Sequence, residues 1–340
     1  MAATLAQYKY LGPDAEIRRG IGLTIVKQSP WLSELPFVEI NNNISRYKME
    51  LAAAAADTYE VGDTWLEGTP TWEYRDAALS ILGGDADDDK FGRLATGGED
   101  TMASMIELKS KAVANWFDEL AILGQTTAVA KWSASKNFKG LLRLICECES
   151  AASTDLDGAI FSAFSAGNNS QVVQAASGAS GVLTLDMIDV LVDCVKPKPT
   201  HLVMNRQLRR KLGGLARAAG NNLTIRTGAL GEIITSYGEQ IILVDDYTPI
   251  NFPDPTTIVS APAAYTPTTS VAAGNDTSPV FALRMGEDGL CGIHGAGMIH
   301  VERFNQLETK DAERVRIKFY AGMRLTNKLA AAVLLSATAS

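Results

Sequence analysis

A ribbon of alternating residues with no core of its own is the sequence feature that most constrains how this chain folds. From Val38 to about Leu82, apolar and polar residues alternate in two limbs, Ser45–Leu51 and Thr71–Arg75, and this pattern predicts a long β-hairpin. The stretch between the limbs is too polar and too marked by glycine to form a core. An isolated two-stranded ribbon is marginal in water, so its aromatic side chains need another surface. These aromatic residues are Tyr47, Tyr59, Trp65, Trp72 and Tyr74.

Two interpretations of the ribbon stay open from the residues alone. In the first, the body of the subunit lies elsewhere in the sequence, and the five aromatic residues are candidates for contact with a neighbouring chain. In the second, the ribbon folds back onto its own domain.

The most regular periodicity predicts a helix from about Gly98 to Leu123. Thr96-Gly-Gly-Glu99 has the form of a capping box, and Gly124 supplies a C-terminal stop. At 1.5 Å per residue the helix is about 39 Å long, which favours a structural spine, although an ordinary amphipathic core helix has the same pattern. The apolar positions that recur every three or four residues are Met102, Met105, Ile106, Val113, Trp116, Phe117, Leu120 and Leu123.

Shorter elements surround this helix. Residues 1–36 hold a helical stretch around Asp14–Gly22 and then a proline-limited segment, which together predict an arm. A Pro-, Thr- and Ser-rich excursion, Pro249–Pro279, is expected to be mostly loop. The other predicted elements are strands at Leu141–Glu147, Gln171–Ala175 and His201–Met204, and helices at Leu183–Val195, capped by Thr184, and at Arg206–Ala219.

Two alternating strands are predicted near the end of the chain, Met298–Phe304 and Glu313–Tyr320. In the second strand, apolar and basic residues fall on opposite faces, so the basic face requires either solvent or acidic partners. The apolar residues are Val315, Ile317 and Phe319, and the basic residues are Arg314, Arg316 and Lys318.

Charge and hydropathy limit the classes of function. The 340 residues carry 31 Lys and Arg against 39 Asp and Glu, a formal charge of −8, which argues against tight nucleic-acid binding but not against enclosing DNA. The longest apolar run, Leu329–Leu335, is far shorter than the roughly 20 residues that span a bilayer. With no basic-then-apolar leader before Lys9, we expect a cytoplasmic product without a signal peptide.

One region reverses this acidic balance. Between Asp193 and Arg226 there are eight Lys and Arg residues and no acid except Asp193. Such a surface binds either phosphate or acidic groups of its own or neighbouring subunits, and the sequence does not decide between them.

Motifs that would indicate chemistry are incomplete. Asp85-Ala-Asp-Asp-Asp begins like a calcium loop, but Lys90 and Thr96 occupy positions that an EF-hand gives to Gly and Glu, which excludes an EF-hand. An exposed acidic turn is expected, with a looser cation site as the alternative. The glycine-rich stretch Gly286–Gly297 lacks a following Gly-Lys-Ser/Thr and is expected to form flexible turns. Cysteine and histidine form no catalytic or zinc-site spacing, although a strand would place Cys146 and Cys148 on one face. No catalytic residue, metal or cofactor is predicted.

The order of these elements resembles the major capsid proteins of tailed bacteriophages, which have the Hong Kong 97-type fold. The segments that carry the resemblance are Gln28–Asn41, Ile81–Asp85, Gly97–Asp100, Phe138–Leu141 and Leu307–Gly322. The resemblance implies an α+β subunit with an N-arm, an extended E-loop, a spine helix, a peripheral P-domain and an axial A-domain. The implied boundaries are 1–36 for the N-arm, 37–88 for the E-loop, 89–184 for the spine helix and first part of the P-domain, 185–296 for the A-domain and 297–340 for the C-terminal strands of the P-domain.

By the same resemblance the chain is a structural virion protein and not an enzyme. Such subunits assemble in the host cytoplasm as hexamers and pentamers into an icosahedral shell around double-stranded DNA, without sequence-specific binding and without a membrane. Scaffolding and portal proteins are the implied partners, with decoration proteins as a further class, and Lys48 and Asn327 are candidates for a covalent crosslink. A neighbour that receives the E-loop would supply the missing surface for the aromatic ribbon. Deletion of about residues 52–67 should then leave a soluble subunit that forms shells poorly.

Two other functions are kept beside this one. An encapsulin, the shell protein of a bacterial nanocompartment, shares the fold and would hold a cargo protein. A soluble nucleotide-binding enzyme would use the region Gly286–Gly297 and would be a stable monomer or dimer.

Overall fold

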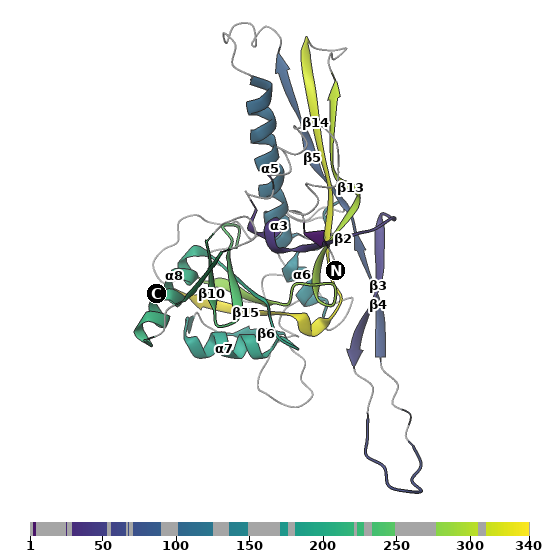
Figure 1. Ribbon diagram of the computed structural model, residues 1–340, viewed down its shortest axis with the longest axis vertical. Coiled ribbons are helices and arrows are strands. Elements are labelled where there is room, and N and C mark those ends of the chain that lie inside the picture. The colour runs from purple at the N-terminus through teal and green to yellow at the C-terminus, as the bar shows by residue number, and fades with distance from the viewer. Residues whose placement is uncertain are drawn as a thin grey trace.

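The computed structural model describes residues 3–4, 25, 29–52, 56–65, 67, 71–89, 101–124, 136–148, 171–175, 181–220, 223–227, 233–248, 277–304 and 311–339. Figure 1 shows an elongated molecule with a tall part built around one long helix, a rounder part beside its lower end, and a hairpin that projects away from both. Each part has its own sheet.

The long helix, α5 (Thr101–Leu123), confirms the predicted spine. Val113, Phe117 and Leu120 are buried at the spacing that the periodicity predicts, whereas Met105 is partly exposed. The helix ends where Gly124 N donates to the Leu120 carbonyl. The proposed capping box at 96–99 lies outside the described residues.

A five-stranded sheet packs on α5. Its strand order is β1 (Ala3–Thr4), β2 (Pro36–Glu39), β13 (Leu290–Phe304), β14 (Ala312–Leu325) and β5 (Ser80–Asp89). The two terminal strands of the sequence are therefore confirmed as β13 and β14, and both are longer than predicted. The predicted range 37–88 for the E-loop is wider than the projecting hairpin, because β2 and β5 pair with body strands.

The two faces of β14 separate as the alternation predicts. Val315, Ile317 and Phe319 are buried in the main core. The basic residues on the other face have acidic partners: Arg314 pairs with Asp87, Arg316 with Asp85 and Lys318 with Glu302. The sequence 85–89 is consequently part of a strand that pairs with β14, and the expectation of an exposed acidic turn was wrong.

The glycine-rich stretch forms a turn only in part: Gly286 and Gly289 lie in the turn before β13 as expected, whereas Gly292, Gly295 and Gly297 lie within strand β13. At Gly292 the reason for glycine is a close contact, since an added Cβ would lie 2.5 Å from the Phe37 ring. Glycine here lets β2 and its phenylalanine pack against the strand.

An eight-stranded sheet forms the rounder part. Its main path is β6 (Val172–Gln174), β15 (Ala331–Thr338), β12 (Ser278–Leu283), β8 (His201–Met204), β11 (Gln240–Val244), β10 (Ile233–Tyr237) and β9 (Thr224–Thr227), and β7 (Gly181–Val182) pairs with β15. The 3-10 turn η3 (Lys328–Ala330) leads from β14 into β15. The last strand of the chain thus lies in this sheet, beside the strands of the predicted A-domain.

Two helices cover one face of this sheet, α7 (Leu185–Asp193) and α8 (Arg206–Ala218). Leu202 and Met204 of β8 join the cluster beneath these helices, whereas Val203 between them faces the main core. Both helices were predicted, and Thr184 caps α7 by accepting from Met187 N.

A short helix, α6 (Leu141–Cys146), stands where a strand was predicted, so that prediction was wrong. Leu141, Leu144 and Ile145 are all buried, and a short apolar run of this kind does not distinguish a buried helix from a buried strand. Cys146 and Cys148 are consequently not on one face of a strand, and both are free, buried thiols.

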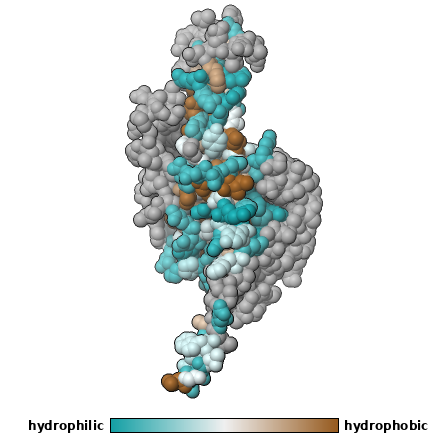
Figure 2. All heavy atoms as spheres, turned by 90° about the vertical axis from the view of Figure 1, so that its right-hand side faces the viewer, coloured by the Kyte–Doolittle hydropathy of each residue, from teal (hydrophilic) through white to brown (hydrophobic). Residues whose placement is uncertain are grey.

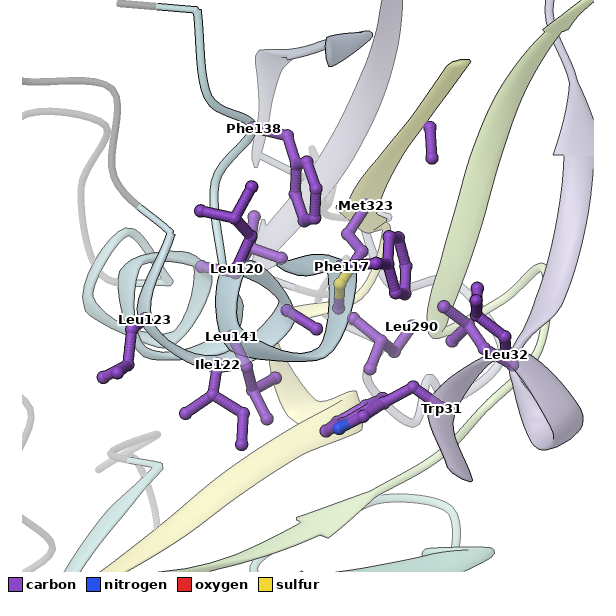
Figure 3. Close-up of a cluster of buried hydrophobic side chains, with 14 of the residues drawn as sticks. Trp31, Leu32, Phe117, Leu120, Ile122, Leu123, Phe138, Leu141, Leu290 and Met323 are labelled. Carbon is purple, nitrogen blue, oxygen red and sulfur yellow. The ribbon is translucent and has the colours of Figure 1, made fainter. Parts of the chain in front are cut away.

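The main core lies where three helices meet both sheets. Figure 3 shows Trp31 and Leu32 of α3 (Pro30–Glu34) beside Phe117 and Leu120 of α5, with Leu141 of α6 close by. No helix of the described chain is both long and apolar enough to cross a membrane.

Candidate inter-subunit surface

The projecting hairpin consists of β3 (Ile44–Ala52) and β4 (Thr71–Ala78), which pair antiparallel as the sequence predicts. Tyr47 lies opposite Arg75 and Lys48 opposite Tyr74. Because side chains alternate between the faces of a ribbon, these two pairs lie on opposite faces. The hairpin therefore has an inner face toward the body and an outer face away from it.

The inner face packs on the hairpin's own subunit. Ser45, Met49, Arg75 and Ala77 are buried, and Tyr47 packs against the main core. Burial raises the pKa of the Tyr47 hydroxyl. At its base the ribbon thus folds back onto its own domain, as the second interpretation expected.

Arg75 is the unusual member of the inner face, because its side chain is only 5% exposed. Its Nη2 donates to Glu73 Oε2 over 2.7 Å, while Nε and Nη1 have no hydrogen-bond partner. Glu73 is therefore the group that compensates this buried charge.

The outer face carries aromatic and charged side chains in contact with solvent. Trp72 and Tyr74 are 55% and 62% exposed, and Lys48 Nζ lies 5.2 Å and 5.7 Å from their ring centroids. Such distances allow cation–π attraction. Beyond them, Arg46 binds the Asp76 carboxylate and lowers its pKa.

The tip of the hairpin comprises residues 56–65 and 67. Tyr59 and Trp65 stack with ring centroids 4.2 Å apart, yet Trp65 remains 77% exposed and Val61 is fully exposed. Figures 1 and 2 show this tip extending past the described helices and strands of the body. The described residues of the tip make turn contacts of their own, such as Glu60 N donating to Asp63 Oδ2, and none of them belongs to a hydrophobic core cluster.

The tip is also acidic. Four acids, Asp57, Glu60, Asp63 and Glu67, lie in a stretch that has no Lys or Arg between Lys48 and Arg75. The exposed side chains therefore combine apolar and aromatic surface with negative charge.

The five predicted contact residues separate into three groups. Tyr59 and Trp65 come together at the tip, Trp72 and Tyr74 lie on the outer face, and Tyr47 packs on its own subunit. Only the strand register separates Tyr47 from Tyr74, so composition could not have done so. Sequence reasoning missed Val61, whose signal was an apolar residue beside a turn glycine in a polar stretch.

The described residues offer few candidate sites for metal binding or for a small molecule. Among the residues that the structure describes, no group of three or more His, Cys, Asp and Glu is placed to hold a metal ion. An open pocket of about 770 Å³ lies between α7 and the β10–β11 hairpin, lined by residues that include Asp189, Lys196 and Tyr237. No residue of the stretch Gly286–Gly297 lines it, so the enzyme alternative finds no support there.

Comparison with known proteins gives the same architecture at low sequence identity. No family model matches the sequence, and no curated protein is significantly similar to it. Among solved structures, the SrpI encapsulin complex from Synechococcus elongatus PCC 7942 matches with a TM-score of 0.59 and 14% identity, covering 92% of this chain and 88% of the other.

Two further matches come from the capsid of a GTA particle and from a phage. The capsid of a native GTA particle matches with a TM-score of 0.58 and 13% identity over 96% of this chain and 92% of the other. A chain of Mycobacterium phage Bobi matches with a TM-score of 0.53 and 13% identity over 92% and 91%. Each match spans nearly the whole chain. The chain therefore has the Hong Kong 97-type capsid fold, an α+β fold.

Proposed function

We propose that this chain is the major capsid protein of a tailed bacteriophage, which self-assembles as hexamers and pentamers into an icosahedral shell around double-stranded DNA. The observation that carries the proposal is the hairpin tip, where Trp65 and Val61 are exposed on a segment that touches no core of its own. Clustered apolar and aromatic side chains of this kind favour a protein partner. In the shell, that partner is a second copy of the chain.

The chemistry of the tip defines the surface that receives it. Trp65 and Val61 require an apolar recess on the neighbouring subunit, and the four tip acids require neutral or basic residues around it. Trp72 and Tyr74 on the outer face belong to the same contact surface. Tyr47 is left out, because its ring already packs on its own subunit.

The partners and location follow from this role. Scaffolding and portal proteins guide assembly in the host cytoplasm, decoration proteins bind the finished virion, and the DNA is enclosed without sequence-specific contacts. The chain acts structurally and not as an enzyme. Its N-arm, E-loop, spine helix, P-domain and A-domain serve as parts of one shell tile.

A second candidate is an encapsulin-type shell, which the match to the SrpI encapsulin complex favours. Both candidates require self-assembly through the hairpin, and they differ in what the shell contains. Particles with packaged double-stranded DNA support the phage role, whereas particles that hold a cargo protein and no genome support the encapsulin role.

The test is expression of the full chain followed by sedimentation and negative-stain microscopy. We expect discrete megadalton particles. A stable monomer or dimer with nucleotide affinity would overturn the shell proposal and favour the enzyme alternative.

A paired variant tests the role of the tip. The double variant Val61→Ser/Trp65→Ser should reduce particle yield at least tenfold without lowering the unfolding midpoint of the free subunit, because neither side chain packs on its own core. The matched control, Val182→Ser/Ile225→Ser, removes two exposed apolar side chains from the rounder part and should assemble normally. Normal yield from the tip variant, or an equal loss in the control, would contradict the proposed role of the tip.

A further inference from the structure

Helix α8 presents a strongly basic surface on the rounder part of the molecule. Asn205 caps the helix by accepting from Leu208 N, and Leu208, Leu212 and Ala216 bury one side against the eight-stranded sheet. The helix contains five cations and no acid, namely Arg206, Arg209, Arg210, Lys211 and Arg217. In a chain with a net charge of −8, this concentration of positive charge is local to one element.

The structure distinguishes which of these charges are neutralised. Arg206 binds the Asp246 carboxylate through two hydrogen bonds. Within the described part of the chain, the other four cations pair with no acidic side chain. The basic face of β14, by contrast, is paired residue by residue with acids, as in Arg316 with Asp85. Helix α8 therefore retains positive charge that no described acidic side chain of its own chain neutralises.

The outward side of α8 is a continuous ridge. Arg206, Arg210 and Arg217 recur at helical spacing on the side opposite Leu208 and Leu212, so the ridge is about 16 Å long. Gly213 and Gly214 lie between Arg210 and Arg217, and both are half-buried; a Cβ at Gly213 would lie 3.6 Å from the Leu223 side chain. A Cβ at Gly214 would meet no atom within 4 Å, so the subunit's own packing does not require a glycine there. Glycine disfavours a helix interior, and its presence here permits another chain to approach the backbone closely.

The composition of this ridge favours a polyanion over a protein partner. Protein interfaces have an apolar or aromatic centre, as the hairpin tip does, but no large apolar side chain of α8 is exposed. Arginine and lysine without apolar neighbours are typical of contacts with a phosphate backbone. Duplex DNA carries one negative charge per roughly 1.7 Å of its axis, so a ridge of this length can reach several phosphates. Figure 1 places α8 on the opposite side of the molecule from the hairpin, which keeps the two surfaces separate.

We propose that the outward ridge of α8 contacts the phosphate backbone of duplex DNA without regard to sequence. This inference rests on the proposed function, because it gives the enclosed DNA a defined point of contact on each subunit. Arg209, Arg210 and Arg217 are exposed and supply the charge, and Gly214 allows the close approach.

The experiment titrates full-length, unassembled protein into a fluorescent 30-base-pair duplex of random sequence at several NaCl concentrations. The variant Arg209→Gln/Arg210→Gln/Arg217→Gln should bind at least tenfold more weakly at low salt. The slope of log K against log salt should fall in magnitude by about 0.9 for each phosphate that the variant no longer neutralises. Glutamine maintains helix propensity and leaves the buried side of α8 unchanged, so the variant should fold.

The substitution Gly214→Leu should also weaken binding while leaving the unfolding midpoint no lower than that of the wild type.

A matched control separates a site from an effect of net charge. Arg46→Gln/Lys111→Gln/Lys198→Gln removes the same number of exposed positive charges, each of which already has an acidic partner. We expect this control to retain both the affinity and the salt slope. An equal loss in the control, or unchanged binding by the α8 variant, would overturn the proposal. So would an α8 variant that binds DNA normally but no longer forms particles, which would make the ridge a contact between subunits. Shell formation by the wild type is scored separately by microscopy, so failure of the proposed function would be recognised independently of the DNA titration.

Discussion

The N-terminal arm segment and the hairpin tip differ in whether their aromatic side chains are buried in the core. The arm segment 29–39 contains α3 and β2, whereas the described tip of the hairpin, residues 56–65 and 67, contains only turn and irregular structure. In the arm, Trp31, Leu32, Leu35 and Phe37 are buried completely or almost completely. In the tip, Tyr59 and Trp65 pack on each other and remain outside the core. The arm is therefore part of the core, whereas the tip is the surface that we propose for contact with another chain.

Buried polar contacts fix the arm to two different parts of the subunit. Ser29 donates its hydroxyl hydrogen to Asp118 on the spine helix, and Trp31 Nε1 donates to Asp245 Oδ2 over 2.6 Å just after β11. On the same side of α3, Glu34 Oε2 lies 3.6 Å from His201 Nε2. The arm thereby links the spine to the eight-stranded sheet, whereas the described apolar side chains of the tip, Val61 and Trp65, are exposed.

The sharpest test of this comparison substitutes one tryptophan in each segment. Trp31→Ala should lower the free energy of unfolding by about 3–5 kcal/mol, because it empties a buried site. Trp65→Ala should leave that free energy unchanged and reduce assembly instead, because its ring is mostly exposed. Chemical denaturation of the free subunits, with particle counts alongside, measures both effects. Equal destabilisation by the two variants would show that the arm and the tip do not differ in their contribution to the core.

The arm should also make stability depend on pH. Burial raises the pKa of Asp245 from 3.8 to about 6, and burial together with the nearby Asp245 raises the pKa of Asp118 well above its usual value. The folded chain consequently binds these protons more tightly than the unfolded chain does. The stabilisation from Asp245 is complete below pH 3.8 and is lost as the pH rises through about 6. The loss is on the order of 3 kcal/mol, at about 1.4 kcal/mol per pKa unit.

Unfolding measured from pH 4 to pH 8 checks this expectation. Asp245→Asn should flatten the fall in stability across that range, since asparagine does not titrate. The neighbouring Asp246→Asn is the control and should preserve most of the wild-type slope, because Asp246 is exposed, pairs with Arg206 and contributes less than burial to the raised pKa of Asp245. A wild-type stability that rises between pH 5 and pH 7 would show that the pKa of Asp245 is not raised.

The smallest expected effect compares the two faces of the hairpin base. Glu73→Ala leaves the buried guanidinium of Arg75 without its acceptor and should lower the free energy of unfolding by about 1–3 kcal/mol. Asp76→Ala removes only the exposed partner of Arg46 and should leave the unfolding midpoint unchanged. Thermal unfolding midpoints of the two variants measure this difference. Identical midpoints would mean that the inner face of the hairpin does not pack as part of the body.

Prediction from sequence succeeded where a pattern was long enough to have one meaning. Helix α5 repeats its apolar residues over 23 positions, and the basic face of β14 required either solvent or acidic partners, of which the structure supplies acids in Asp85 and Asp87. Prediction failed where a short run of residues was compatible with two kinds of secondary structure. Leu141–Cys146 forms a helix in place of a strand, and the acids of β5 are strand residues because β14 offers arginines at matching register.

The sequence by itself determined the secondary structure of the spine, the terminal strands and the hairpin, together with the amphipathic character of α8. These follow from periodicity, which depends only on neighbours along the chain. Tertiary structure alone decided that Tyr47 faces the core while Tyr74 faces solvent, that Trp31 meets Asp245, and that four cations of α8 have no acidic partner within the described part of the chain. Each of these depends on register or on contacts between residues far apart in the chain, and local periodicity carries no information about which distant surfaces meet.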